Sequence, residues 1–234
     1  MNVGSTTEAS QHKLPLDRTQ LAVLWTLLAL VILTLTVAVL GTTVPIFHVV
    51  WLVIPLANLI RYRDANRVGF RPLTWQRFLR GAVAAGIAYG LLLVLVEPWT
   101  GVYDRLLSLA LEGPDPTFAW LVRIDGPGRW VTLVVFSGLV TLYSEELFFR
   151  GWLLQLLARR TRARNAIIGQ ALVFTLLQSI PAFFFDPVQA LLYLAVYAFG
   201  LGIIVGTVAH RTESIWPGLT VVTVANLILS LLLV

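Results

Sequence analysis

The residues best suited to chemistry in this sequence are two adjacent glutamates and an arginine, Glu145, Glu146 and Arg150. They lie in the otherwise apolar stretch from Trp130 to Leu157. An ionisable group at membrane depth costs a few kcal/mol, so it is rare there and usually has a function. Glu146 and Arg150 are four residues apart and can neutralise each other on one helix face. Glu145 then has no partner nearby in the sequence, which makes it the strongest candidate for chemistry.

The composition indicates an all-α polytopic membrane protein. Of 234 residues, 58% are hydrophobic and only 12% are charged, against about 25% charged in soluble domains. The net charge of +5 comes almost entirely from arginine. In a membrane protein arginines set the topology and contact anionic headgroups, so we expect membrane lipids and no nucleic acid as partners.

Neither a cofactor nor a metal site is expected. The sequence has no cysteine, which excludes disulfides, a thiol nucleophile and thiolate metal ligands. The three histidines, His12, His48 and His210, are scattered, which argues against a zinc site. His210 precedes Arg211 at the expected end of a span, where basic side chains suit a helix C-terminus.

Apolar segments divide the chain into about seven transmembrane helices, each near the roughly 20 residues that cross a bilayer. A polar cytoplasmic tail is expected over 1–19, followed by two transmembrane helices within 20–68. The expected spans are 20–41, 44–60, 79–97, 130–149, 165–184, 188–209 and 215–234.

Proline and glycine positions add local detail. Pro187 opens a helix in the first turn, where proline is tolerated. Gly86 with Gly90, and Gly202 with Gly206, are each four residues apart. Small residues at this spacing predict close packing between membrane helices.

Loop charges predict one orientation. Arginines crowd the connections 61–80 and 159–164, whereas acidic residues predominate in 97–129 and Asp186 is the charge of the turn 185–187. Positive loops face the cytoplasm, so the N-terminus is expected inside and the C-terminus outside, in a bacterial plasma membrane. The basic clusters are also interpretable as binding patches for anionic lipid.

The 98–129 connection is expected to contain one or two interfacial helices on the outer face. Apolar residues recur in it at helical spacing, with Trp99, Tyr103 and Trp120 in or beside them. Such aromatic side chains favour the headgroup region. The segment is either an interfacial anchor or a lid over a substrate site.

The run Glu145-Glu146-Leu147-Phe148-Phe149-Arg150 resembles the EExxxR signature of the CPBP family. This family comprises the CAAX prenyl proteases and bacteriocin-processing (Abi) membrane proteins, including glutamic intramembrane proteases. The segment 202–217 is similar to the one that leads into the family's last catalytic helix. The resemblance covers about 69–234 and implies a CPBP-like helical membrane core there.

Two further family motifs map onto this sequence with changes. FxxxH falls on 174–178 with Gln178 at the histidine position, and HxxxN falls on 222–226 with Val222 at the histidine position and Asn226 retained. The resemblance implies that Glu145 is a general base, Asn226 an oxyanion donor and Gln178 an altered water-holding residue. Gln178 and Asn226 are equally interpretable as ordinary interhelical hydrogen-bonding residues.

These changes predict impaired or lost peptidase activity. Glutamine cannot take up a proton near neutral pH, and losing one oxyanion donor costs about a hundred- to a thousandfold in rate. The expected function is to bind a membrane-tethered peptide, a lipid or a membrane partner in the former active-site cavity. One alternative is an active glutamate-dependent endopeptidase of CAAX-processing type. Another is a structural accessory subunit of a larger integral membrane complex.

Overall fold

The computed structural model describes residues 46–101, 142–182 and 185–232, together with Leu24, Leu27, Leu28, Val31 and Ile32. Within this part of the chain there are helices and short connections and no strand, which confirms the all-α prediction for these residues. The polar tail, most of the first expected span and positions 102–129 of the expected interfacial segment lie outside the described residues.

The helices follow the apolar segments, with shifted ends. The elements are α2 (Ile46–Tyr62), η1 (Ala65–Val68), α3 (Trp75–Thr100), α7 (Leu142–Glu145), η3 (Glu146–Leu153), α8 (Leu154–Ala158), α9 (Ala163–Leu177), α10 (Ser179–Ala182), α11 (Pro187–Leu192), η4 (Tyr193–Ala198), α12 (Phe199–Thr212) and α13 (Trp216–Leu232). Helix α3 begins four residues earlier than expected because Thr74 caps it, accepting a hydrogen bond from the Arg77 N–H. Residues 98–100, expected in the interfacial loop, are the last residues of α3.

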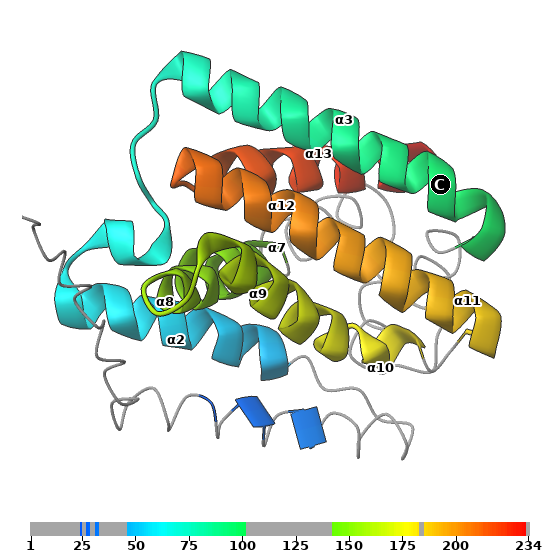
Figure 1. Cartoon of the computed structure of the whole chain (residues 1–234), viewed down its shortest axis with the longest axis horizontal. Helices are drawn as coiled ribbons and strands as arrows, with labels where there is room; N and C mark the ends of the chain where they lie inside the picture. The colour runs from blue at the N-terminus through cyan, green and yellow to red at the C-terminus, as the bar shows by residue number, and fades with distance from the viewer. Residues whose placement is uncertain are drawn as a thin grey trace, which may run out of the picture.

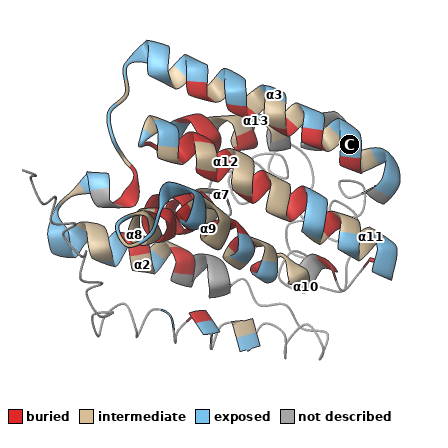
Figure 2. Ribbon diagram, viewed as in Figure 1, coloured by how far each residue is buried: buried red, intermediate tan, exposed pale blue. Residues whose placement is uncertain are grey.

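Two of the helical stretches are long and apolar enough to cross a membrane, Trp75–Trp99 and Pro187–Thr212. At 1.5 Å per residue, 25 residues span about 37 Å, more than the roughly 30 Å of bilayer hydrocarbon. The first carries large exposed apolar side chains along one face. In Figure 2 the outer side of α3 is largely exposed. Such an apolar stripe suits contact with lipid. These exposed side chains are Val83, Ile87, Leu91 and Val94.

The expected fifth span, 165–184, is interrupted: α9 stops at Leu177, and a separate short helix, α10, covers Ser179–Ala182. Gln178 closes α9 with its N–H bonded to the Phe174 carbonyl oxygen at 3.0 Å. Pro181 has no N–H with which to continue this helical pattern. By contrast, the prediction for Pro187 is confirmed, since it lies in the first turn of α11 behind the N-cap Asp186.

The described helices pack side by side, with α12 beside α3 and α9 and with α13 alongside α3 (Figure 1). The α2–α3, α8–α9 and α12–α13 connections all lie at one end of this bundle, at the left of Figure 1. The two arginine-rich connections are therefore at the same end.

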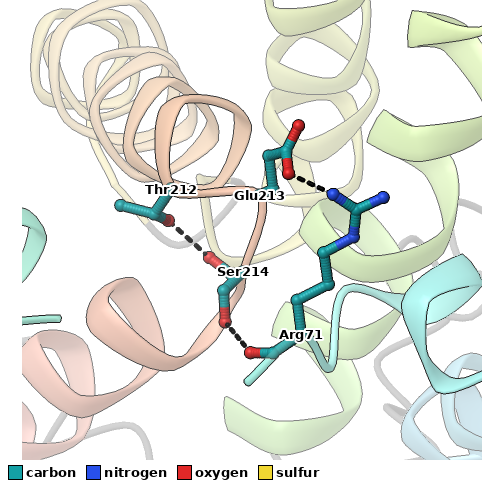
Figure 3. A network of polar contacts seen from close by, with 4 residues as sticks. All are labelled: Arg71, Thr212, Glu213 and Ser214. Atoms are coloured by element: carbon teal, nitrogen blue, oxygen red, sulfur yellow. Dashed lines mark hydrogen bonds and ion pairs between the residues drawn. The ribbon is translucent and has the colours of Figure 1, made fainter. Parts of the chain in front are cut away.

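Polar contacts at this end join the segment before α3 to the α12–α13 turn (Figure 3). The Ser214 hydroxyl donates to the Arg71 carbonyl oxygen at 3.2 Å, and Arg71 forms an ion pair with Glu213. The Thr212 hydroxyl donates to the Ser214 carbonyl oxygen at 3.0 Å. Segments more than 140 positions apart in the sequence are thereby held together.

Close approach of neighbouring segments explains three glycines. A Cβ at Gly151 would overlap the carbonyl oxygen of Val68. At Gly202 a Cβ would lie 2.9 Å from that of Ala171, and at Gly206 it would overlap the Gln170 amide. Close packing at Gly202 and Gly206 is thus confirmed, between α12 and α9.

The corresponding prediction for Gly86 and Gly90 is wrong within the described part of the chain. A Cβ at either position has no neighbour within 4 Å. Both residues lie on α3, whose contacts with α12 and α13 are made by other faces. Four-residue spacing of glycines therefore indicates a small helix surface but does not say whether another helix covers it.

We expect Gly151→Ala to destabilise the protein by about 1–3 kcal/mol, because the added methyl group overfills a site closed by backbone. The matched control is Gly90→Ala, also within a helix, which should raise stability by about 0.5–1 kcal/mol through the loss of backbone freedom in the unfolded chain. Denaturant unfolding of the purified variants in mild detergent measures both. Equal effects would contradict the close approach at Gly151.

Candidate active site

The acidic pair lies at the start of a π-helical segment. Glu145 ends α7 and Glu146 begins η3, which continues to Leu153. At its end the Leu154 N–H bonds to the Phe149 carbonyl oxygen, five residues back. In this geometry residues five apart are hydrogen-bonded neighbours, so Arg150 lies close to both glutamates. Short π-helical segments are rare and frequently occur at functional sites.

Glu146 and Arg150 form a buried ion pair, as their spacing predicts. The Arg150 Nη1 lies 3.3 Å from the Glu146 Oε1, and the two residues are 1% and 2% exposed. The Arg150 guanidinium also lies 4.3 Å from the centroid of the Phe174 ring, a cation–π contact that is strong when desolvated. Among the described residues, the Glu146 Oε2 and the Arg150 Nε have no hydrogen-bond partner.

Glu145 is less buried than Glu146 and contacts α9. Its carboxylate lies within hydrogen-bonding reach of the side chain of Gln178 and interacts electrostatically with Arg150. The expectation that Glu145 lacks a partner nearby in the sequence is therefore incomplete, because the π-helical segment also brings Arg150 within reach. The structure brings Glu145 and Gln178 together from segments 33 positions apart, as the motif alignment implies.

The Gln178 amide is engaged on its other side by a tyrosine. The Tyr193 hydroxyl donates to the Gln178 Oε1 at 2.8 Å. Because the amide oxygen accepts this bond, the amide NH₂ is the group left to donate to Glu145. Glu145, Gln178 and Tyr193 thus form a continuous polar chain through the bundle.

A second pair of hydroxyls adjoins this chain. The Tyr193 and Tyr197 rings stack in η4 with centroids 5.5 Å apart. The Tyr197 and Tyr89 hydroxyl oxygens are 3.2 Å apart. The sequence reasoning missed all three tyrosines. The sequence feature that could have identified these tyrosines is a hydroxyl within an apolar span. Such a group needs a hydrogen-bond partner inside the protein, because water is absent there.

Helix α13 presents an apolar surface to the ion pair. A Cβ at Gly218 would lie 3.8 Å from the Glu146 Oε2. One turn later Val222 is 4% exposed and belongs to the apolar core that includes Phe174 and Tyr193. Asn226 lies a further turn along α13, and its side chain is outside the described residues. Val222 therefore supplies no hydrogen-bond donor to this site.

The described residues contain no cluster of three or more residues of the types that hold a metal ion. His210 lies in the last turn of α12, as expected. It lines a cavity between α3 and α12 at the end of the bundle. Gln178 and Tyr193, rather than a histidine, are the side chains that join Glu145 in the polar chain.

Comparison with known proteins identifies the region that contains the site. Residues 127–228 match the family model described as type II CAAX prenyl endopeptidase, Rce1-like. This range includes Glu145, Gln178, Tyr193 and Val222. No curated protein and no solved structure matches the chain.

We expect Glu146→Gln to destabilise the protein by about 3–5 kcal/mol, because it removes the close partner of a buried cation. The control Glu213→Gln breaks the Arg71–Glu213 pair, whose side chains are 47% and 60% exposed. Exposed pairs contribute about 0–1 kcal/mol. Unfolding in mild detergent measures both variants.

The double variant Glu146→Gln/Arg150→Met should recover much of the lost stability, because it also removes the buried cation that Glu146→Gln leaves unpaired. A loss from Glu146→Gln no larger than that from Glu213→Gln would contradict a structural dependence on the buried pair.

Proposed function

Because residues 127–228 match the family model described as type II CAAX prenyl endopeptidase, Rce1-like, we propose that this integral membrane protein binds a membrane-tethered peptide beside Glu145 and hydrolyses it poorly or not at all. The observation that carries this proposal is the engagement of Gln178. Its oxygen accepts from Tyr193 and its NH₂ donates to Glu145. This side chain can hold a carboxylate in place, but it cannot accept a proton from water.

Hydrolysis of an amide needs a base to activate water and an acid to protonate the leaving amine. A well-placed acid–base group contributes about 10²–10⁴ in rate. In this arrangement Glu145 performs both steps without an imidazole beside it. The buried Val222 side chain also supplies no oxyanion donor, which typically costs another 10²–10³. Together these changes predict a rate at least about ten-thousandfold below that of a complete site.

Peptide binding has weaker requirements than hydrolysis. The Glu145 carboxylate has two oxygens and about four acceptor positions, of which the Gln178 amide fills one. The remaining positions are suited to backbone N–H groups of an extended peptide. Partial exposure of Glu145 supports access from outside the core. An intact acid with an altered neighbour therefore favours binding over turnover.

An active endopeptidase is the second candidate, favoured by one feature. Glu145 keeps a hydrogen-bonding neighbour in Gln178, and an amide can orient a water that the carboxylate activates. This candidate requires turnover that depends on Glu145 and is slowed when Gln178 loses its hydrogen-bonding groups. The two candidates thus differ in a measurable rate.

We expect purified wild-type protein to bind a prenylated peptide with a carboxyl-terminal CAAX sequence without cleaving it detectably. The variant Gln178→His/Val222→His should gain cleavage, because it adds a proton acceptor beside Glu145 and a donor on α13. The matched control Gln178→His/Val222→His/Glu145→Gln should lose that gain. Mass spectrometry of the released tripeptide and fluorescence anisotropy of labelled peptide measure cleavage and binding.

Cleavage by the wild type that disappears in Glu145→Gln would establish the active endopeptidase instead. Failure of the wild type to bind the peptide at all would contradict the binding role.

We also propose that about seven helices span a bacterial plasma membrane, with the N-terminus in the cytoplasm. The location of both arginine-rich connections at one end of the bundle supports this orientation (Figure 1). At the opposite end, the α11 N-cap Asp186 is the charge between α10 and α11. The same orientation puts the α12–α13 turn on the cytoplasmic side.

The absence of cysteine from the sequence permits a direct test of this orientation. In intact bacterial cells, Val188→Cys should react with a membrane-impermeant maleimide. Thr161→Cys, in the α8–α9 connection, should react only after the cells are permeabilised. Both positions are exposed, so accessibility within the protein does not separate them. The reverse labelling pattern would invert the proposed topology.

A further inference from the structure

A cavity of about 830 Å³ lies between the first half of α3 and the last half of α12, away from Glu145. Arg77 and Arg80 on α3 and Arg211 on α12 line its outer end. Ala84 and Ala88 line it deeper along α3. The cavity therefore changes from basic to apolar as it runs from the end of the bundle toward the middle.

The basic end carries uncompensated positive charge. Arg77, Arg80 and Arg211 are exposed, and none has a carboxylate at ion-pair distance within the described part of the chain. The acidic residue on the rim, Glu213, forms an ion pair with Arg71 (Figure 3). Arg71 lies outside the cavity lining and neutralises Glu213. Glu213 therefore does not act as a counterion for the three cavity arginines.

The helix geometry increases this demand for an anion. The first turn of α3 contains no acidic residue, although the positive end of a helix dipole favours one. Arg77 instead adds a positive charge there. A phosphate held between the arginines would supply negative charge near the first turn of α3.

The apolar end has the dimensions of a lipid chain rather than of a small anion. From Arg80 to Ala88 is eight residues, or about 12 Å along the helix. The facing side of α12 contributes Ile203 and Ile204. Small alanines opposite branched side chains leave a groove that continues from the basic end toward the hydrocarbon layer. Inorganic phosphate would fill the first part and leave the second empty.

We propose that this cavity binds an anionic phospholipid, with its phosphate between Arg77, Arg80 and Arg211 and the upper part of one acyl chain along Ala84 and Ala88. Arginine recognises phosphate through paired N–H donors. An anionic lipid neutralises part of the arginines' positive charge. A zwitterionic lipid carries its own cation and therefore does so less well, so the site should prefer the anionic lipid. The site is separate from Glu145, so its occupancy is independent of peptide cleavage.

A second basic cavity provides a control. It lies at the α8–α9 connection, has a volume of about 1000 Å³ and is lined by Arg159, Arg160, Arg162 and Arg164. Its apolar lining is limited to Ala158 and Ile168. It offers similar charge without an extended apolar groove, so general attraction to anionic membranes would act on it equally.

The test uses the full-length protein in mild detergent and native mass spectrometry with phosphatidylglycerol, phosphatidylcholine or inorganic phosphate. We expect the wild type to prefer phosphatidylglycerol. Each lost arginine should weaken binding about fivefold, so Arg77→Gln/Arg211→Gln should weaken it about 25-fold. The control Arg162→Gln/Arg164→Gln should change it no more than about twofold. Glu145→Gln should bind phosphatidylglycerol like the wild type.

A groove-filling variant separates lipid from free phosphate. Ala84→Leu/Ala88→Leu should weaken phosphatidylglycerol binding at least about tenfold while leaving inorganic phosphate binding unchanged. Unfolding midpoints without added lipid show whether each variant is folded. The single variants Arg77→Gln and Arg80→Gln repeat the measurement if a double variant is destabilised.

Three outcomes would overturn the proposal. The first is unchanged lipid binding by Arg77→Gln/Arg211→Gln and by both single variants. The second is an equal loss in Arg162→Gln/Arg164→Gln, which would indicate non-specific surface charge. The third is phosphatidylglycerol binding that survives groove filling and is displaced by inorganic phosphate at equal concentration, which would identify a phosphate site.

Discussion

The buried ion pair between Glu146 and Arg150 constrains the middle of the bundle, because both charges lie in the core. A guanidinium in an apolar core is stable only if a carboxylate and an aromatic face compensate its lost hydration. Glu146 supplies the carboxylate from one turn away, and Phe174 on α9 supplies the aromatic face. Because both partners must be present together, the pair fixes how η3 packs against α9. The position of Glu145, the preceding residue, follows from that packing.

The π-helical segment gives this constraint a further consequence. In a regular α-helix Arg150 would serve Glu146 at i+4 and would lie off the face of Glu145. With residues five apart as neighbours, the one cation interacts with both carboxylates. Arg150 thereby stabilises Glu145 in an apolar environment, while the ion pair of Arg150 is formed with Glu146. The acceptor positions of the Glu145 carboxylate are not all occupied by Arg150. Its remaining hydrogen-bonding capacity is directed toward the end of α9, where Gln178 lies.

Composition and hydrophobic spacing were sufficient to predict the described helices and the Glu146–Arg150 pair, because each depends on residues near one another in sequence. The end of α9 was not predicted, because Pro181 was counted within an apolar run rather than as a backbone without an N–H. The π-helical geometry and the contacts of Tyr193 depend on packing between segments distant in sequence. The open space beside Gly86 and Gly90 depends on which faces of α3 the neighbours cover.

Stability and hydrolysis place opposite demands on positions 178 and 222. A buried amide is costly unless its donors and acceptor are satisfied, and Gln178 meets this condition through Glu145 and Tyr193. Val222 has no polar group to satisfy, and it packs into the apolar core. An imidazole at either position would supply proton transfer or a donor, yet it would need polar partners that Val222 in particular does not have around it. Gln178 and Val222 therefore both meet the requirements of their surroundings as they stand, which is consistent with the proposed binding role of Glu145.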